Sequence, residues 1–385
     1  MDVKLLQRVK VVDTDDLSAT LLEILQTEGY QRPLFVMDHF LASVPLVQKA
    51  QKVLKKNDIQ YAVFDKVVSD PPAATVMAGV QAFQNHEADS IIAIGGGSSI
   101  DVARGINIVR INGGEILDYT KPGVEIKDCP GLIAVPTTSG TGSEMSNALV
   151  VTDAATEAKL AILADNAVSE YAVLCPDMVL SLPQKMTIAT GLDAFSHAAE
   201  GYTSNLSSPV TDAVCEKVMF LLANYLPRAV KDGQDREARQ RVMVAAALAG
   251  WMLNNAGTNV GHSMAHVLGS KYHIVHGEAV AYALPGVLNF VAPVMPKKVA
   301  EIGQILGLTY RDDEDEATRT QRAIEAYRHF RDDTLGLHPF ADYGISTEQL
   351  LENTTAVAHE RFAGNTPRRV DEAAATELLK EFGRR

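Results

Sequence analysis

One aspartate and several histidines in the second half of the chain have the spacing of metal ligands. Asp193 and His197 stand four residues apart in GLDAFSHAAEGY, and His262 and His266 repeat that spacing in VGHSMAHVLGSKYHIVHG. Residues four apart lie one turn apart on the same face of a helix. A carboxylate and several imidazoles, without a thiolate, suit a borderline divalent cation. The candidate ligands are Asp193, His197, His262, His266, His273 and His276.

The alternative interpretation is that each histidine packs in a core or caps a helix. For a single histidine this would be the better interpretation. Here, however, two pairs lie in stretches of mostly small and apolar residues. Unpaired polar groups are costly to bury in such surroundings, which favours a bound cation.

A glycine triplet at residues 95–97 follows the apolar run SIIAI at 90–94. Glycines let the backbone turn sharply and let a diphosphate approach the amides without a Cβ in the way. Ser98 and Asp101 have the spacing of a capping box, which predicts a helix that begins at Ser98 with its N-terminus toward an anion. The triplet is not the G-x-G-x-x-G pattern, and a plain tight turn is the alternative. Because the triplet follows a buried strand in a series of alternating strands and helices, we predict that it binds phosphate.

The elements that must position these residues fall into two zones. Apolar strands alternate with helices up to about residue 183, which predicts an α/β fold with a mostly parallel, Rossmann-like sheet. From Lys185 onward the 3.6-residue pattern dominates, so we predict an all-helical second domain at 184–385. Strands are expected near the start of the chain and at 32–37, 60–64, 90–94, 131–136 and 172–174, helices at 17–28, 44–56 and 74–85, and a hairpin at 148–152 and 159–163.

Composition excludes several classes of partner. The 385 residues carry a net charge of −13, which argues against nucleic acid or an anionic membrane surface. The three cysteines are far apart and lack CxxC spacing, so neither a disulfide framework nor a thiolate zinc site is expected. No stretch has the length and apolarity of a signal peptide core or a membrane span. These features fit a cytoplasmic protein.

Four segments together carry a family resemblance: IIAIGGGSSID, PTTSGTGSE, GLDAFSHAAEGY and VGHSMAHVLGSKYHIVHG. In order and spacing they resemble the iron-containing (group III) alcohol dehydrogenases, which include lactaldehyde reductases and 1,3-propanediol dehydrogenases. The resemblance extends from about Arg32 to Arg368 and includes GNTPR at 364–368. It implies an NAD-binding domain at 1–183, a metal-binding domain at 184–385, an active site in the cleft between them, and a homodimer or larger oligomer.

The resemblance also implies roles for single residues. The metal would be Fe²⁺, with zinc as the other candidate, and its ligands Asp193, His197, His262 and His276. His266 would lie near the substrate as a catalytic proton relay rather than as a ligand. Gly96, Gly97 and Ser98 would hold the cofactor diphosphate, Thr137, Thr138 and Thr141 would line the nicotinamide, and Lys159 would reach a ribose. The implied chemistry is a metal-assisted hydride transfer between an alcohol and NAD(H).

Asp38, at the carboxyl end of the strand expected at 32–37, predicts a preference for NAD(H) over NADP(H). An acidic side chain there can accept hydrogen bonds from the adenosine ribose hydroxyls, and it would repel a 2′-phosphate. The nearest basic residue, His39, is mostly neutral at pH 7. The alternative is that Asp38 only caps the segment that follows.

Two other functions fit parts of the pattern. A lyase of the dehydroquinate synthase type has the same two-domain plan and uses NAD only transiently. It would need basic residues for an anionic substrate, and the segment 193–276 offers few apart from Lys271. A non-catalytic nucleotide-binding module would bind NAD without turnover. The leading interpretation is an NAD-dependent alcohol dehydrogenase or aldehyde reductase that acts on a small alcohol or aldehyde.

Overall fold

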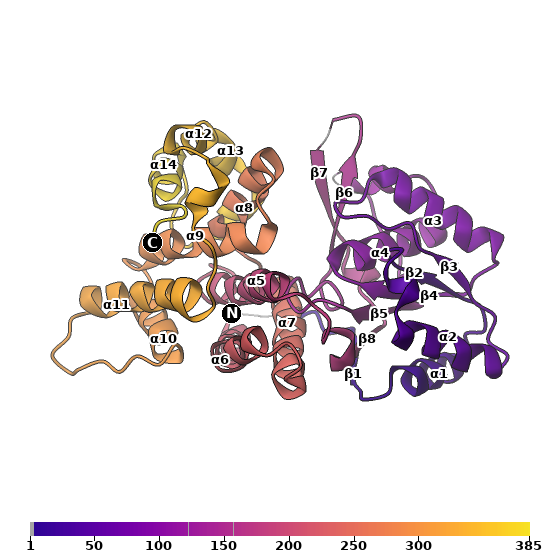
Figure 1. Cartoon of the computed structure of the whole chain (residues 1–385). Coiled ribbons are helices and arrows are strands. Elements are labelled where there is room, and N and C mark those ends of the chain that lie inside the picture. Colours follow the sequence, from indigo (N-terminus) through magenta and orange to yellow (C-terminus); the bar gives the residue numbers. More distant parts are fainter. Residues whose placement is uncertain (1–3, 122, 157) are drawn as a thin grey trace. The chain divides into compact units, whose positions relative to one another are not determined.

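Six parallel strands form the sheet at the centre of the first half of the chain (Figure 1). The computed structural model describes residues 4–121, 123–156 and 158–385. The spatial order of the strands is β1-β8-β5-β4-β2-β3. The predicted α/β class with a parallel sheet is therefore confirmed. The strands are β1 (Lys10–Asp13), β2 (Pro33–Val36), β3 (Ala62–Phe64), β4 (Ser90–Gly95), β5 (Leu132–Pro136) and β8 (Tyr171–Leu174).

The strand order creates a switch point between β2 and β4. From β2 the chain steps outward to β3 on one side, whereas β4, β5 and β8 extend on the other side. In open α/β sheets, ligands bind outside the carboxyl ends of the strands at such a point. Asp38 follows β2 and the triplet at 95–97 follows β4, so both lie at the switch point.

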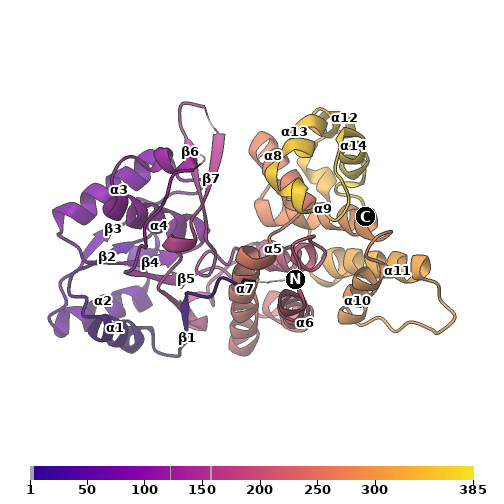
Figure 2. The same cartoon turned by 180° about the vertical axis from the view of Figure 1, so that it is seen from behind.

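Helices cover both faces of this sheet, as the two opposite views in Figures 1 and 2 show. Successive strand residues point to opposite faces. Leu34 and Ile91 accordingly pack with α3 (Ala73–Asn85) and α4 (Gly97–Asn112). Phe35 and Ile92 pack with α1 (Leu17–Glu28) and α2 (Pro45–Lys56). Burial of both faces explains why these strands are continuous apolar runs without alternation.

The predicted hairpin is a separate two-stranded antiparallel sheet formed by β6 (Ala148–Asp153) and β7 (Ala158–Leu163). Glu157 in its turn lies outside the described residues. At the start of the chain, the predicted strand and helix are β1 and α1, and residues 1–3 also lie outside the described part. None of the helices in the described ranges is long and apolar enough to cross a membrane.

The remainder of the chain is helical, as predicted, and the described residues after β8 contain no strand. Its central helix, α5, packs against α6, α7 and α9. A Cβ on Gly277 would lie 2.0 Å from the carbonyl oxygen of Ala189, so only glycine lets the start of α9 approach α5 this closely. The helices are α5 (Gln184–Tyr202), α6 (Pro209–Lys231), α7 (Arg236–Ala256), α8 (Val260–Tyr272), α9 (His276–Val291), α10 (Pro296–Ile305), α11 (Glu316–His329), α12 (Thr347–Leu351), α13 (Thr354–His359) and α14 (Glu372–Glu381).

The chain divides into two compact units. The α/β unit consists of Leu6–Thr138 and Gly142–Ser181. The helical unit contains Leu182–Arg385 together with the short segment Ser139–Thr141. That segment packs against α5, because a Cβ on Gly140 would lie 2.6 Å from the Cβ of Thr190.

Candidate metal centre and cofactor site

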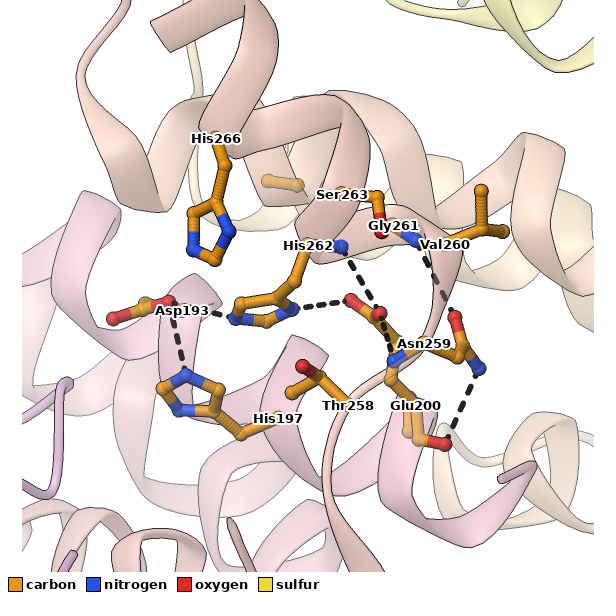
Figure 3. Close-up of polar contacts among 12 residues, drawn as sticks. Asp193, His197, Glu200, Thr258, Asn259, Val260, Gly261, His262, Ser263 and His266 are labelled. Atoms are coloured by element: carbon orange, nitrogen blue, oxygen red, sulfur yellow. Dashed lines mark hydrogen bonds and ion pairs between the residues drawn. The ribbon is translucent and has the colours of Figure 1, made fainter. Parts of the chain in front are cut away.

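The four ligands implied by the family resemblance come from three helices of the helical unit: Asp193 and His197 from α5, His262 from α8 and His276 from α9. Figure 3 shows the first three of them. Oδ1 of Asp193 lies 3.6 Å from Nε2 of His197, 3.8 Å from Nε2 of His262 and 3.6 Å from Nε2 of His276. Atoms that bind one ion tetrahedrally at about 2.1 Å are about 3.4 Å apart. One donor atom each from Asp193, His262 and His276 also lies within 4.8 Å of the others. The cluster therefore has the spacing of donors around a single cation.

Three atoms of this cluster are buried without a hydrogen bond among the described residues, and one of them, Nδ1 of His197, is not the nitrogen that faces Asp193. Among the described residues, neither Oδ1 of Asp193 nor Nε2 of His262 has a hydrogen-bond partner. A buried polar atom without a partner costs about 1–3 kcal/mol. Both atoms face the middle of the cluster, where a cation would bind to both. The residues present therefore fit a divalent metal.

The local sequence explains how the ligands meet. Asp193 and His197 share one face of α5 at the predicted spacing of four. His262 lies in the first turn of α8, whose start is capped by the Asn259 side chain through the N–H of Gly261. His276 is the first residue of α9, and the following Gly277 allows the close approach to α5 described above.

Charge and burial set the protonation states that a cation needs. Burial by itself would raise the pKa of Asp193, but the facing imidazoles of His197 and His276 hold it below the usual range. Burial and the neighbouring ring of His197 lower the pKa of His262 well below its usual range. An ionised carboxylate and a neutral imidazole with a free lone pair are the forms that bind metal.

Glu200 is a further polar group at this site, and the sequence analysis missed it. It is completely buried on α5, and its Oε1 lies 2.7 Å from Nδ1 of His262. Its Oε2 accepts the backbone N–H groups of Asn259, at 2.9 Å, and His262, at 3.1 Å. Burial raises the pKa of Glu200 to about 8, against the lowering effect of these two N–H groups. A signal existed, because Glu200 continues the helix face of Asp193 and His197 at a spacing of seven from Asp193.

His266 lies beside the cluster without joining it. Its ring stacks on that of His276 with a centroid separation of 5.6 Å, and its Nδ1 is 3.2 Å from Oε1 of Glu360. Ser263 donates a hydrogen bond of 2.6 Å to the other oxygen of Glu360. Burial would raise the pKa of Glu360, but these contacts to His266 and Ser263 lower it. The contacts with Glu360 and His276 hold the His266 ring in place. The side chain is 37% exposed, so it also reaches the solvent.

Glu360 was also missed, and it lies 94 residues after His266, between α13 and the short 3₁₀-helix that follows. Its side chain caps the short 3₁₀-helix η7 (Arg361–Asn365). His273, in contrast, was a candidate ligand from its sequence position. It is exposed and ends α8 in a left-handed conformation with φ of 55°, outside the cluster.

The glycine triplet joins β4 to α4, because Gly95 is the last residue of the strand and Gly97 the first of the helix. Gly96 is the N-cap of α4 and the helix begins at Gly97, so the predicted start at Ser98 is wrong. No side chain caps this end; Asp101 instead accepts the backbone N–H of Val150 at 3.0 Å. Gly95 has φ of 154°, and a Cβ there would lie 2.3 Å from Oγ of Ser99. The first N–H groups of α4 therefore stay available to an anion at the edge of the sheet.

Thr137 and Thr138 follow β5 next to this triplet. The N–H of Thr137 donates to the carbonyl of Gly95 at 3.0 Å, and a Cβ on Gly96 would lie 3.2 Å from Cγ2 of Thr138. Thr141 belongs to the segment that packs with the helical unit. The structure thus brings Thr137 to Gly95 and Thr138 to Gly96.

Asp38 and Lys159 both have protein partners. Oδ1 of Asp38 accepts the N–H of Leu41 at 3.0 Å, at the first residue of the short 3₁₀-helix η1 (Leu41–Ser43), whose N-cap residue is Phe40. Nζ of Lys159 lies 2.6 Å from Oδ1 of Asp70. Neither contact excludes a cofactor, since a carboxylate has about four acceptor sites and an ammonium three donors.

Comparison with known proteins identifies the family. Residues 10–176 match the family described as "Iron-containing alcohol dehydrogenase", and residues 187–383 match "Fe-containing alcohol dehydrogenase family, C-terminal". The chain belongs to the iron-containing alcohol dehydrogenases. The predicted resemblance is confirmed.

Relatives of known activity agree with this family. The chain is 34% identical over 326 residues to an NAD-dependent methanol dehydrogenase of Bacillus methanolicus, covering 85% of each chain. It is 33% identical over 350 residues to a 1,3-propanediol dehydrogenase of Klebsiella pneumoniae, covering 88% of this chain and 90% of the relative. A crystal structure of a 1,3-propanediol oxidoreductase superposes with a TM-score of 0.93 at 29% identity, covering 99% of this chain and 100% of the other. The chain is thus an alcohol oxidoreductase, and the two alternative functions receive no support.

Proposed function

We propose that this iron-containing alcohol dehydrogenase interconverts a small alcohol or diol and its aldehyde or ketone with NAD(H) and a divalent metal. The observation that carries the proposal is the cluster of Asp193, His197, His262 and His276, in which the buried Oδ1 of Asp193 and Nε2 of His262 lack a hydrogen-bond partner within the described residues. The names of the relatives, a methanol and a 1,3-propanediol dehydrogenase, support small substrates. Iron follows from the family, while zinc stays a candidate because three nitrogens and one oxygen do not select strongly between them.

The chemistry follows from the charges of these residues. A divalent cation bound there supplies a Lewis acid, which lowers the pKa of an alcohol and polarises a carbonyl. Asp193 would contribute the single negative charge of the ligand set, because imidazoles bind a metal in the neutral form. His266, oriented by Glu360, would move the hydroxyl proton between substrate and water.

The cofactor is proposed to bind the α/β part of the chain, residues 1–183, and the metal the helical part, residues 184–385. NAD(H) carries the hydride, and the protein supplies orientation and charge. Two features support the position of the cofactor. One is the switch point between β2 and β4, and the other is the N-terminus of α4 at Gly96 and Gly97, which has no side-chain cap among the described residues. Ser98, Thr137, Thr138, Thr141 and Lys159 are the other proposed contacts.

The proposed function is tested by NADH absorbance on a panel of short alcohols, diols and aldehydes. The apoprotein is loaded with Fe²⁺ without oxygen, or with Zn²⁺, before the assay. We expect turnover only with metal present. A protein that binds metal and NAD(H) and yet turns over no member of the panel would contradict the proposal.

Asp38 is expected to set the preference for NAD(H). Asp38→Gly removes the negative charge that would face a 2′-phosphate, so the ratio of kcat/KM for NADP(H) to that for NAD(H) should rise about tenfold, which corresponds to ~1.4 kcal/mol. The measurement is steady-state kinetics with both cofactors. A wild-type enzyme that already prefers NADP(H) would defeat this prediction.

A second carboxylate separates this role from capping. Asp16 caps α1 through the N–H groups of Ser18 and Ala19. Asp16→Ala should lower stability by about 0.5–2 kcal/mol and leave the cofactor ratio unchanged. If Asp38→Gly behaves in the same way, Asp38 is only a cap.

The chain is further proposed to form a homodimer or larger homo-oligomer in the cytoplasm. The oligomer rests on the family resemblance, and the compartment is supported by the three cysteines, which are far apart in the chain and lack CxxC spacing. Sedimentation velocity at assay concentration should show a species of at least twice the monomer mass. A profile that contains only monomer would refute the oligomer.

A further inference from the structure

Glu200 connects His262 to the turn between α7 and α8 (Figure 3). None of its surface is exposed, and all of its contacts described above come from that turn or from the first residues of α8. The side-chain amide of Asn259 also donates to the backbone carbonyl of Glu200 at 3.3 Å. Asn259 therefore contacts both the side chain and the backbone of Glu200.

The role of each carboxylate oxygen is fixed by its neighbours. Oε2 faces two backbone N–H groups, of Asn259 and His262, and backbone N–H groups can only donate. Oε2 must therefore be an acceptor. Oε1 faces Nδ1 of His262, and a Cβ on Gly261 would lie 2.6 Å from it. Only a glycine at position 261 therefore leaves space for the carboxylate at this distance from α8.

The two nitrogens of His262 face different groups. Nδ1 lies against Glu200, whereas Nε2 is buried 3.8 Å from Oδ1 of Asp193 and has no hydrogen bond among the described residues. A neutral imidazole carries one proton, and the hydrogen bond of one nitrogen determines the state of the other. Whichever group Glu200 presents to Nδ1 thus decides whether Nε2 has a lone pair.

We propose that Glu200 is a positioning residue that keeps the proton of His262 on Nδ1 and so leaves the lone pair of Nε2 for the metal. This inference rests on the proposed function, because it requires His262 to be a ligand. Histidines that bind metals commonly donate their other N–H to a carboxylate, which fixes the tautomer and the orientation of the ring. Glu200 supplies that acceptor from the same helix as Asp193 and His197.

Glu200→Gln tests the proposal with almost no change in shape. The glutamine carbonyl must take the place of Oε2, because the two backbone N–H groups need an acceptor. Its NH₂ group then points at Nδ1 of His262 and forces the imidazole proton onto Nε2. We expect the affinity of the apoprotein for Zn²⁺, measured in competition with a chelator, to fall about 10–100-fold.

Glu360→Gln is the matched control, because it makes the same chemical change at the carboxylate that contacts Nδ1 of His266. His266 is not a proposed ligand, so this variant should bind Zn²⁺ as the wild type does. Circular dichroism and thermal unfolding of both apoproteins show whether the fold is kept. A folded Glu200→Gln protein with wild-type Zn²⁺ affinity would overturn the proposal, as would an equal loss in both variants.

A second measurement keeps the proposal testable even if Glu200→Gln does not fold. Imidazole ¹⁵N chemical shifts of the wild-type apoprotein distinguish a protonated nitrogen from one with a lone pair. At a pH above that at which Glu200 ionises, we expect His262 to be protonated at Nδ1, and a proton on Nε2 there would overturn the proposal. His262→Ala separates the two levels of inference: if that variant keeps its Zn²⁺ affinity, the ligand set itself is wrong. If it loses affinity but folded Glu200→Gln does not, only the role of Glu200 fails.

Discussion

His262→Ala and His276→Ala each abolish alcohol oxidation and lower the bound metal while the fold is kept; this is the expected result with the largest effect. Each change removes one of four donors around the proposed cation, and the remaining donors bind it more weakly. Without the Lewis acid the reaction loses several kcal/mol of charge stabilisation, which corresponds to about a 10³-fold or larger fall in rate. Metal analysis by mass spectrometry and NADH absorbance are the measurements.

The two variants differ in their structural risk. His262 is buried, so its truncation leaves a cavity, whereas the side chain of His276 is 43% exposed. His276→Ala is therefore the cleaner test of ligation. The matched control is His273→Asn, because His273 is exposed and asparagine tolerates its left-handed backbone. This control should keep both metal and activity; full metal occupancy in both alanine variants would remove His262 and His276 from the ligand set.

His266→Gln should reduce turnover by about 10²–10⁴-fold, the usual contribution of a general acid or base, while the metal content stays near that of the wild type. Glutamine can still contact Glu360 but cannot carry a proton. The stacking of His266 on His276 and its partial exposure place it where a proton could pass between the substrate and water. Turnover is measured in both directions across the pH range, together with the bound metal.

The outcome separates a proton relay from packing. Unchanged turnover at every pH would show that His266 only fills space beside His276. A parallel loss of metal would make His266 a ligand, contrary to the proposal. Glu360→Gln should lower turnover in the same direction, since Glu360 contacts Nδ1 of His266 and holds its ring.

The local sequence alone determined which residues could act together on one element. The i, i+4 spacing predicted that Asp193 and His197 share a face of one helix, and α5 has both on that face. The apolar runs predicted the strands, because side chains buried on both faces of a parallel sheet must be apolar. The glycine triplet and the capping-box spacing of Ser98 and Asp101 predicted a helix start at the sheet edge, although the first helical residue is Gly97 instead of Ser98.

That error shows where local pattern fails. Ser98 and Asp101 have capping-box spacing, but the carboxylate of Asp101 is used by Val150, 49 residues later in the chain. Spacing also could not separate His273 from His276, which are three residues apart. The end of α8 at His273 and the start of α9 at His276 give these two side chains different surroundings.

Only the tertiary structure decided which helix faces meet. Glu200 reaches His262 across 62 residues, and Glu360 reaches His266 across 94. Spacing within one helix follows from the 3.6-residue turn and can be read locally. The approach of α9 to α5 depends instead on the absence of a side chain at Gly277. The contact of Glu200 with α8 depends in the same way on the absence of a side chain at Gly261. Such contacts arise from packing between segments far apart in the chain, and no local pattern encodes them.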